Sequence, residues 1–170
     1  MCRWLLAHGA LASARGEWNV TPLSVAVQEA PIFTVKLLLE RCNGIQSGQL
    51  LHFAIKRDNE DVLEVVEILL NLGCPINSIM FEDDPRSWKE VMFGEPGSPL
   101  FAAAEMGKTD LVVFLLSRGA DPLLPSKKGR TPLEAAESEG HTHIADILRQ
   151  YDTEDHAFPA QTTDPELTQV

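Results

Sequence analysis

Short apolar blocks recur along the chain, and each ends in a glycine followed by a small residue. Clear examples are "EILLNLGCP" at 67–75 and "VFLLSRGAD" at 113–121. Within "VVEILL" (65–70) and "LVVFLL" (111–116), apolar residues recur at i, i+3 and i+4, the spacing that places them on one face of an α-helix. The pattern therefore predicts amphipathic helices that each end at a glycine.

The opening of the chain repeats this pattern, although it also has the outline of a secretory signal peptide. An apolar run precedes an Ala-x-Ala at Ala12 and Ala14. A signal peptide needs an unbroken apolar region of about 7–15 residues, but the run Trp4–Ala7 is interrupted by His8. Because "RWLLAHGAL" at 3–11 matches the two downstream blocks, we predict that the opening is part of the fold.

A second recurring element predicts where other helices begin. Thr21, Ser98 and Thr131 each precede Pro-Leu, and Gln49 begins a degenerate copy. A Thr or Ser side chain can accept a hydrogen bond from a backbone N–H at a helix start, and Pro suits the first helical position because no donor is needed there. Glu134 stands three residues after Thr131, which predicts a reciprocal capping box.

The two kinds of helix alternate with a period of about 33 residues. Ser98 and Thr131 lie 33 positions apart, as do Leu5 and Leu38. One helix pair cannot bury its own apolar face, whereas stacked pairs form a continuous core. The glycines expected to close the second helices in the left-handed conformation are Gly9, Gly73 and Gly119. The prediction is an all-α helical solenoid in which Leu38, Leu69 and Leu115 of the second helices are buried.

The segment "GSPLFAAAEMGKTDLVVFLLSRGADPLLPSKKGRTPLEAAESEGHTHIADILRQ" (97–150) resembles consecutive ankyrin repeats. The resemblance is weaker but clear over 1–77. It implies an ankyrin-type solenoid whose β-turn or hairpin loops project from the helix stack beside a concave surface lined by the first helices. The expected units are a partial repeat (1–18), a repeat (19–48), a repeat with a long acidic insertion at 78–97 (49–97), a repeat (98–130), a capping repeat (131–151) and a disordered acidic tail (152–170).

Composition excludes several function classes. The net charge of −11 disfavours nucleic-acid binding, which requires a basic face. No apolar stretch approaches the roughly 18 residues of a membrane helix, so membrane insertion is not expected. Cys2, Cys42 and Cys74 are odd in number and widely spaced, which is typical of a reducing, intracellular compartment; the expectation is the cytoplasm, with the nucleus as the alternative. No metal cluster, Gly-rich phosphate loop or nucleophile motif is present in the sequence, so no metal or cofactor is expected.

One enzymatic alternative stays open at this point. His52 could act as a general base in the concave groove beside Asp58, Glu105 or Glu134. Resemblance implies instead that His52 makes a structural hydrogen bond to a neighbouring repeat. A further alternative is that the chain is the targeting portion of a longer protein, since its pattern begins inside a repeat.

The leading hypothesis is a non-catalytic protein–protein interaction module, an acidic scaffold or adaptor with an unidentified protein partner. Resemblance places contact residues at turn tips before each Thr-Pro-Leu element and at two positions after each Ala pair. The expected contact residues are Glu17, Trp18, Val20, Gln28, Glu29, Gln46, Lys56, Arg57, Glu95, Glu105, Met106, Lys127, Lys128, Arg130, Ser138 and Glu139. Trp88 in the insertion is a further aromatic candidate. Either Trp18 or Trp88 could alternatively pack onto the solenoid itself.

Overall fold

The fold is built from antiparallel helix pairs that follow one another along the long axis of the molecule. The computed structural model describes residues 2–12, 14, 20–42, 49–80 and 95–153. The helices are α1 (Cys2–Ala7), α2 (Pro22–Glu29), α3 (Ile32–Leu39), α4 (Gln49–Ile55), α5 (Val62–Asn71), α7 (Pro99–Glu105), α8 (Thr109–Ser117), α9 (Pro132–Ser138) and α10 (Thr142–Thr153). The described residues contain no strand. The predicted all-α solenoid is confirmed.

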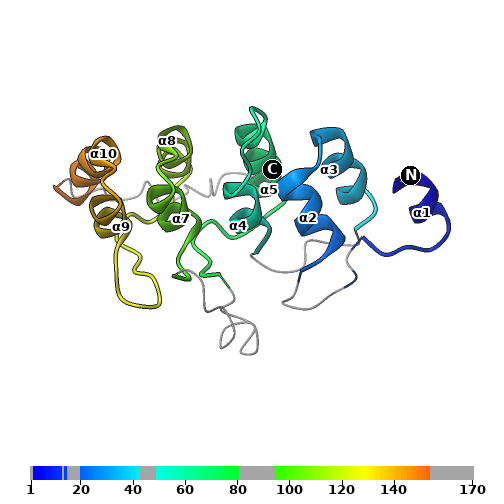
Figure 1. Cartoon of the computed structure of the whole chain (residues 1–170), viewed down its shortest axis with the longest axis horizontal. Coiled ribbons are helices and arrows are strands. Elements are labelled where there is room, and N and C mark those ends of the chain that lie inside the picture. Colours follow the sequence, from blue (N-terminus) through cyan, green and yellow to red (C-terminus); the bar gives the residue numbers. More distant parts are fainter. Residues whose placement is uncertain (1, 13, 15–19, 43–48, 81–94, 154–170) are drawn as a thin grey trace, which may run out of the picture.

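The helices form two rows (Figure 1). The first helices of the pairs, α2, α4, α7 and α9, make one row, and α3, α5, α8 and α10 make the other. Within the first row, α2 contacts α4, α4 contacts α7, and α7 contacts α9. The loop between α8 and α9 projects from the side of the first row. Each pair thus packs against its neighbours in sequence, as a solenoid requires.

The helix starts follow the predicted capping chemistry. Thr131 Oγ1 accepts a hydrogen bond from Glu134 N at 3.2 Å, and Glu134 Oε2 accepts one from Thr131 N at 2.8 Å. The predicted capping box is therefore confirmed. A second box, which the sequence did not reveal, joins Thr21 and Ser24, whose Oγ accepts from Thr21 N at 2.8 Å. Ser98 caps α7 by accepting from the N–H of the third helical residue at 3.2 Å.

The second helices end at the predicted glycines. Gly9, Gly73 and Gly119 have φ values of +90°, +87° and +87°, the left-handed region that suits glycine. At the end of α5, Cys74 N donates to Leu69 O at 3.1 Å, and Gly73 N donates to Leu70 O at 2.9 Å. This crossed pair of bonds is a Schellman motif, and the end of α8 repeats it at Gly119 and Ala120.

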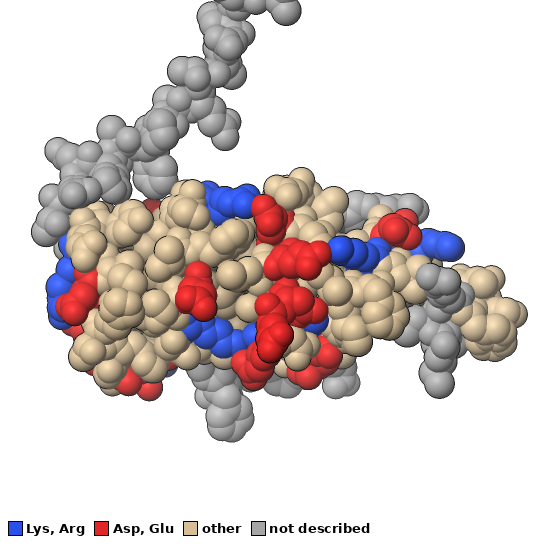
Figure 2. All heavy atoms as spheres, turned by 90° about the horizontal axis from the view of Figure 1, so that it is seen from above, with Lys and Arg blue, Asp and Glu red and all other residues tan. Residues whose placement is uncertain are grey.

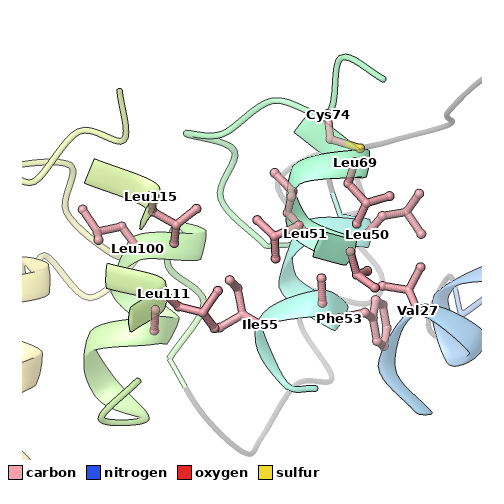
Figure 3. Close-up of a cluster of buried hydrophobic side chains, with 14 of the residues drawn as sticks. Val27, Leu50, Leu51, Phe53, Ile55, Leu69, Cys74, Leu100, Leu111 and Leu115 are labelled. Carbon is pink, nitrogen blue, oxygen red and sulfur yellow. The ribbon is translucent and has the colours of Figure 1, made fainter. Parts of the chain in front are cut away.

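The core runs between the two rows and across successive pairs (Figure 3). Leu69 and Leu115, from the second helices of neighbouring pairs, are fully buried, and Leu38 is 7% exposed. Leu51 and Leu100 come from first helices and are also fully buried. Burial of a leucine side chain contributes about 1.5–3 kcal/mol, so the recurring leucines hold the stack together. The expected burial of Leu38, Leu69 and Leu115 is confirmed.

Polar side chains reinforce the junctions between pairs. The carbonyl groups at the carboxyl end of each first helix have no partner within the helix. Arg57 Nη1 donates to Val27 O of the preceding pair at 3.1 Å, and Lys108 Nζ donates to Ile55 O at 2.9 Å. His141 Nε2 lies 3.2 Å from Glu105 O in the same relation. Each junction is therefore closed by a side chain from the following pair.

The ends of the predicted insertion lie side by side. Met80 N donates a hydrogen bond to Gly97 O at 3.1 Å. The same carbonyl lies 2.9 Å from His52 Nε2. An added Cβ at Gly97 would come within 2.4 Å of the Phe101 ring, so the close approach at this position requires glycine. Residues 81–94, and with them Trp88, lie outside the described residues.

Candidate protein-binding face

The carboxyl ends of the first helices, with the residues that follow them, form one row of outward-facing side chains. This row, named here the helix-end face, consists of Gln28, Glu29, Lys56, Glu105, Met106, Ser138 and Glu139. The residues just before these positions, such as Val27, Ile55 and Ala104, are fully buried. Because successive helical residues turn by about 100°, the chain leaves the core at these positions. The helix-end face therefore follows from where the first helices end.

Most of the helix-end face is open to solvent. Glu29, Lys56, Ser138 and Glu139 are exposed, and Gln28 and Glu105 are half-buried. Met106 is 42% exposed and is the one exposed large apolar side chain of the helix-end face. The expected contact positions at these seven residues are thus accessible, and their role in binding stays a prediction.

Arg57 departs from the expectation. It follows Lys56 and was placed among the contact residues, but only 1% of its surface is exposed. Its Nε and Nη2 donate to the two carboxylate oxygens of Asp61 at 2.6 and 2.7 Å, and its Nη1 reaches Val27 O. The hydrogen bond from Arg57 holds the pKa of the Asp61 carboxyl below its usual range. We therefore remove Arg57 from the candidate contact residues, because its guanidinium is used inside the fold.

Lys56 behaves in the opposite way. Its side chain is exposed, and its Nζ lies 5.9 Å from the centroid of the Phe53 ring. Among the described residues, no carboxylate forms an ion pair with Lys56. A cation above an aromatic face is stabilised weakly at an exposed site. Lys56 therefore presents a positive charge that is available to a partner.

Arg130 joins the projecting turn to the first-helix row. Its Nη2 lies 2.6 Å from a carboxylate oxygen of Glu95, and its Nη1 donates to Ser138 Oγ at 2.9 Å. The guanidinium carbon lies 5.7 Å from the centroid of the Phe101 ring. Ser126 Oγ also donates to Glu95. Arg130 and Ser138, both expected as contact residues, thus have internal partners as well as exposed surface.

Glu95 is a second departure from the expected contact set. Only 9% of its surface is exposed. Burial by itself would raise the pKa of Glu95, but the hydrogen bonds from Ser126 and Arg130 outweigh this and lower it. The Glu95 carboxylate therefore stabilises the turn as a buried anion. It is not accessible as a contact residue.

Glu105 is a half-buried carboxylate on the helix-end face that shares its nearest cation with Glu95. Its Oε1 lies 3.7 Å from Arg130 Nη2, the same nitrogen that is 2.6 Å from Glu95. Burial raises the pKa of Glu105; attraction by Arg130 opposes this, and repulsion by Glu139 and Glu95 adds to the increase. The net direction is upward, which means that the surrounding positive charge does not fully stabilise the ionised form.

The arrangement around His52 favours the structural role. His52 is 2% exposed, and its Nε2 approaches the Gly97 carbonyl across the junction to the next pair. Two of the carboxylates considered as its catalytic partners have other contacts. Asp58 binds Lys108 at 2.8 Å, and Glu134 closes the capping box of α9. The inter-repeat hydrogen bond implied for His52 by the resemblance is present.

The side of the stack on which the second helices lie carries many acidic side chains, and several of these form ion pairs. Acidic side chains gather across the middle of this side (Figure 2). On α5, Glu64 binds Lys36 of α3 at 2.8 Å, and Glu67 binds Arg118, which follows α8. These pairs bridge neighbouring helix pairs. Exposed ion pairs of this kind contribute about 0–1 kcal/mol each, so this side is weakly stabilising and its charges are partly neutralised.

The remaining expected residues differ in where they lie. Lys127 and Lys128 are exposed on the turn between α8 and α9, and Lys127 N donates to Pro96 O at 3.0 Å. Val20 is half-buried and packs against the core. Glu17, Trp18 and Gln46 lie outside the described residues. Val25, 49% exposed on α2, is an apolar surface residue that the sequence analysis did not place among the contacts. The equivalent residues Phe53 and Ala102 are buried and half-buried, so the alignment of repeats gave no signal for its exposure.

The described residues show neither a metal centre nor a membrane-spanning element. No group of three or more His, Cys, Asp or Glu side chains among them could hold a metal ion. None of the helices that the structure describes has the length and apolar character needed to cross a bilayer.

Comparison with known proteins agrees with the helix-pair architecture. A family profile for ankyrin repeats, in three copies, matches residues 51–157. Human 2-5A-dependent ribonuclease is 37% identical over 94 residues, covering 55% of this chain and 11% of that protein. The human ARF GTPase-activating protein GIT1 is 31% identical over 119 residues, covering 68% and 14%. The Caenorhabditis elegans ankyrin repeat and KH domain-containing protein mask-1 is 29% identical over 131 residues, covering 76% and 4%.

The matched part of each relative is small, because the chain spans at most about a seventh of the length of these three proteins. The similarity therefore concerns their ankyrin segments and not the activities in their names. The profile covers more than half of the chain, and the stacked helix pairs, capped starts and glycine-closed ends agree with it. The chain belongs to the ankyrin-repeat family.

Proposed function

We propose that the chain is a non-catalytic scaffold or adaptor module that binds another protein through the helix-end face and the neighbouring projecting turns. The observation that carries this proposal is the helix-end face itself. Four successive helix pairs place exposed polar and apolar side chains in one row, directly beside residues that are fully buried. Side chains that the core does not use are the ones that a partner can contact.

The stack is suited to rigid presentation of this face. The helix ends are fixed by buried leucines and by polar bridges such as Lys108 to Ile55 O. A surface that is already ordered before binding loses less conformational entropy on association. A few anchors carry most of the energy of such an interface. Met106 and Lys56 are the strongest anchor candidates, since one is an exposed apolar side chain and the other a cation without an ion pair among the described residues.

Affinity capture with matched variants tests this proposal. The chain, carrying Lys56→Glu or Met106→Glu, is used to capture proteins from a cell lysate, and each capture is quantified against the unsubstituted chain by mass spectrometry. Control variants make the same chemical changes outside the helix-end face: Arg41→Glu after α3, and Val113→Glu at an exposed position of α8. Circular dichroism establishes that all four variants are folded.

The expected result is that one or more captured proteins are lost with both helix-end variants and retained with both controls. Equal capture by all variants would show that this face does not bind the captured proteins. Equal loss in the controls would point to a general effect of charge. Either outcome contradicts the proposed binding face.

A second candidate role is recognition within a longer protein. The relatives carry the matched segment as a small part of a much longer chain, 4–14% of the three proteins named above. The same helix-end face would then select the partner, and other segments would carry any further activity. The enzymatic alternative at His52 has less support, because that side chain is buried against a backbone carbonyl.

A further inference from the structure

Resting on the proposed function, we propose a chemistry for the partner. The helix-end face takes an extended segment of another protein, and a Lys or Arg side chain of that segment binds between Glu105 and Glu139. A carboxylate of the same segment pairs with Lys56. The partner is thus a segment with one basic and one acidic residue in a fixed spacing.

The first argument is the distribution of charge around Arg130. The negative charges of Glu95 and Glu139 repel that of Glu105, and all three carboxylates attract this guanidinium. Arg130 is committed to Glu95, to which its Nη2 is 1.1 Å closer than to Glu105 (2.6 against 3.7 Å). Glu139 is exposed and forms no ion pair with any described residue. Negative charge is therefore left over at Glu105 and Glu139, and a second cation would neutralise it.

The pKa of Glu105 agrees with this shortage of positive charge. Burial is the main cause of the raised pKa of Glu105; attraction by Arg130 and Lys128 opposes the increase, and repulsion from Glu139 and Glu95 adds to it. A half-buried carboxylate gains more from an added cation than a fully hydrated one, because water screens the pair less. Glu105, with 32% of its side chain exposed, is in that half-buried position.

The second argument is the apolar surface next to Glu105. Met106 follows it in sequence and is 42% exposed, and Ala102, one turn earlier on α7, is half-buried. Lys and Arg carry long aliphatic stems that pack against apolar surface while their charged ends stay hydrated or paired. A flexible thioether adapts well to such a stem. Met106 and Glu105 together therefore fit one basic side chain.

The third argument is the opposite charge one helix away. Lys56 stands at the end of α4, which packs against α7. Packed helices lie about 8–10 Å apart, and an extended chain rises about 3.1–3.3 Å per residue. A segment that crosses from Lys56 to Glu105 therefore spans about three residues. In a polyproline-type conformation, residues three apart lie on the same side, so both charged side chains would face the protein.

Peptide selection against the whole chain tests the inference. A phage-displayed library of random twelve-residue peptides is selected on the unsubstituted protein, and the enriched peptides are synthesised with a fluorescent label. Their affinities are measured by fluorescence anisotropy for Glu105→Gln/Glu139→Gln and for a control, Glu60→Gln/Asp110→Asn. The control removes the same amount of charge from two exposed residues outside the helix-end face.

The enriched peptides are expected to carry Lys or Arg with Asp or Glu about three positions away. The Glu105→Gln/Glu139→Gln variant should bind them at least about tenfold more weakly, the scale of losing one partly buried charge pair, and the control should stay within about twofold. Lys56→Glu should also weaken binding. Replacing the peptide's acidic residue by Lys should restore binding to that variant, since the charge pair is then reversed.

The outcomes separate the inference from the proposed function. Peptides that lose affinity with Met106→Glu but bind Glu105→Gln/Glu139→Gln as tightly as the unsubstituted chain would refute the basic-residue site and leave the binding face standing. Peptides insensitive to Met106→Glu, Lys56→Glu and the double variant alike would refute both. A library that yields no binder would also count against both.

Discussion

The buried guanidinium of Arg57 provides the sharpest test of the fold. We expect Arg57→Met, which keeps the length of the aliphatic stem, to lower the free energy of unfolding by about 2–4 kcal/mol. The variant loses three hydrogen bonds, two to Asp61 and one to Val27 O. Bonds from a charged donor contribute about 1.5–3 kcal/mol each. The loss is smaller than the sum of these three bonds for two reasons. The Asp61 side chain is 26% exposed and can hydrogen-bond to water instead, and the variant no longer has to bury the positive charge of the guanidinium.

Urea unfolding followed by circular dichroism measures the difference, with Lys56→Met as the matched control. Lys56 is the adjacent basic residue and is exposed, so its substitution should change stability by less than about 0.5 kcal/mol. Equal stability of the two variants would show that Arg57 does not hold the junction between α2 and α4. The assignment of Arg57 to the interior would then be wrong.

The pH dependence gives an independent check on the same pair. The folded-state pKa of Asp61 is lowered, chiefly by its hydrogen bond from Arg57. A carboxyl whose pKa is lower in the folded than in the unfolded chain stabilises the fold fully at pH values above its unfolded pKa, which is about 3.9. That stabilisation is lost as the pH falls through the folded-state pKa. The stability difference between the unsubstituted chain and Arg57→Met should therefore narrow below about pH 4. A difference that stays constant down to pH 2 would refute the role of Asp61.

Three further predictions concern the core, a turn and a thiol. Leu115→Ala should cost about 2–5 kcal/mol in urea unfolding, because Leu115 is fully buried, whereas Glu29→Gln should change stability by less than about 0.5 kcal/mol. Gly107→Ala should lower the melting temperature, because φ is +73° and the added Cβ would lie 2.6 Å from the His141 ring; an unchanged melting temperature would contradict this. Burial raises the pKa of Cys74 to about 11, so iodoacetamide at pH 8 should alkylate it only after unfolding, as mass spectrometry can show.

The sequence predicted best those features that depend on neighbouring residues. The cap at Thr131 involves a residue three positions away, and the turn at Gly119 closes onto carbonyls of the preceding helix. Such local chemistry repeats with the period of the chain, so a single sequence reveals it. The leucine burial followed for the same reason, since periodicity fixes which face of each helix is apolar.

Predictions failed where a side chain's environment comes from distant parts of the chain. Arg57 and Lys56 are adjacent basic residues, and their sequence pattern gives no reason to separate them. One is buried because Val27 O, 30 positions earlier, accepts its hydrogen bond. Glu95 is likewise buried by Ser126 and Arg130, more than 30 positions later. The alignment of repeats identified positions that lie near the surface, but it could not show which of those positions the fold itself uses.

The charge that the helix-end face presents to a partner depends on which charged side chains have partners inside the fold. Arg57, Lys108 and Arg130 all lie near the ends of first helices or on projecting turns, and each is committed to carbonyls or carboxylates of a neighbouring pair. These cations stabilise the junctions, so Arg130 neutralises Glu105 and Glu139 only in part. The residual charge on the helix-end face is therefore a consequence of how the stack is held together. Replacing Arg130 by a neutral residue should alter partner binding as well as stability, because it removes the cation nearest to Glu105 and leaves that face more negative.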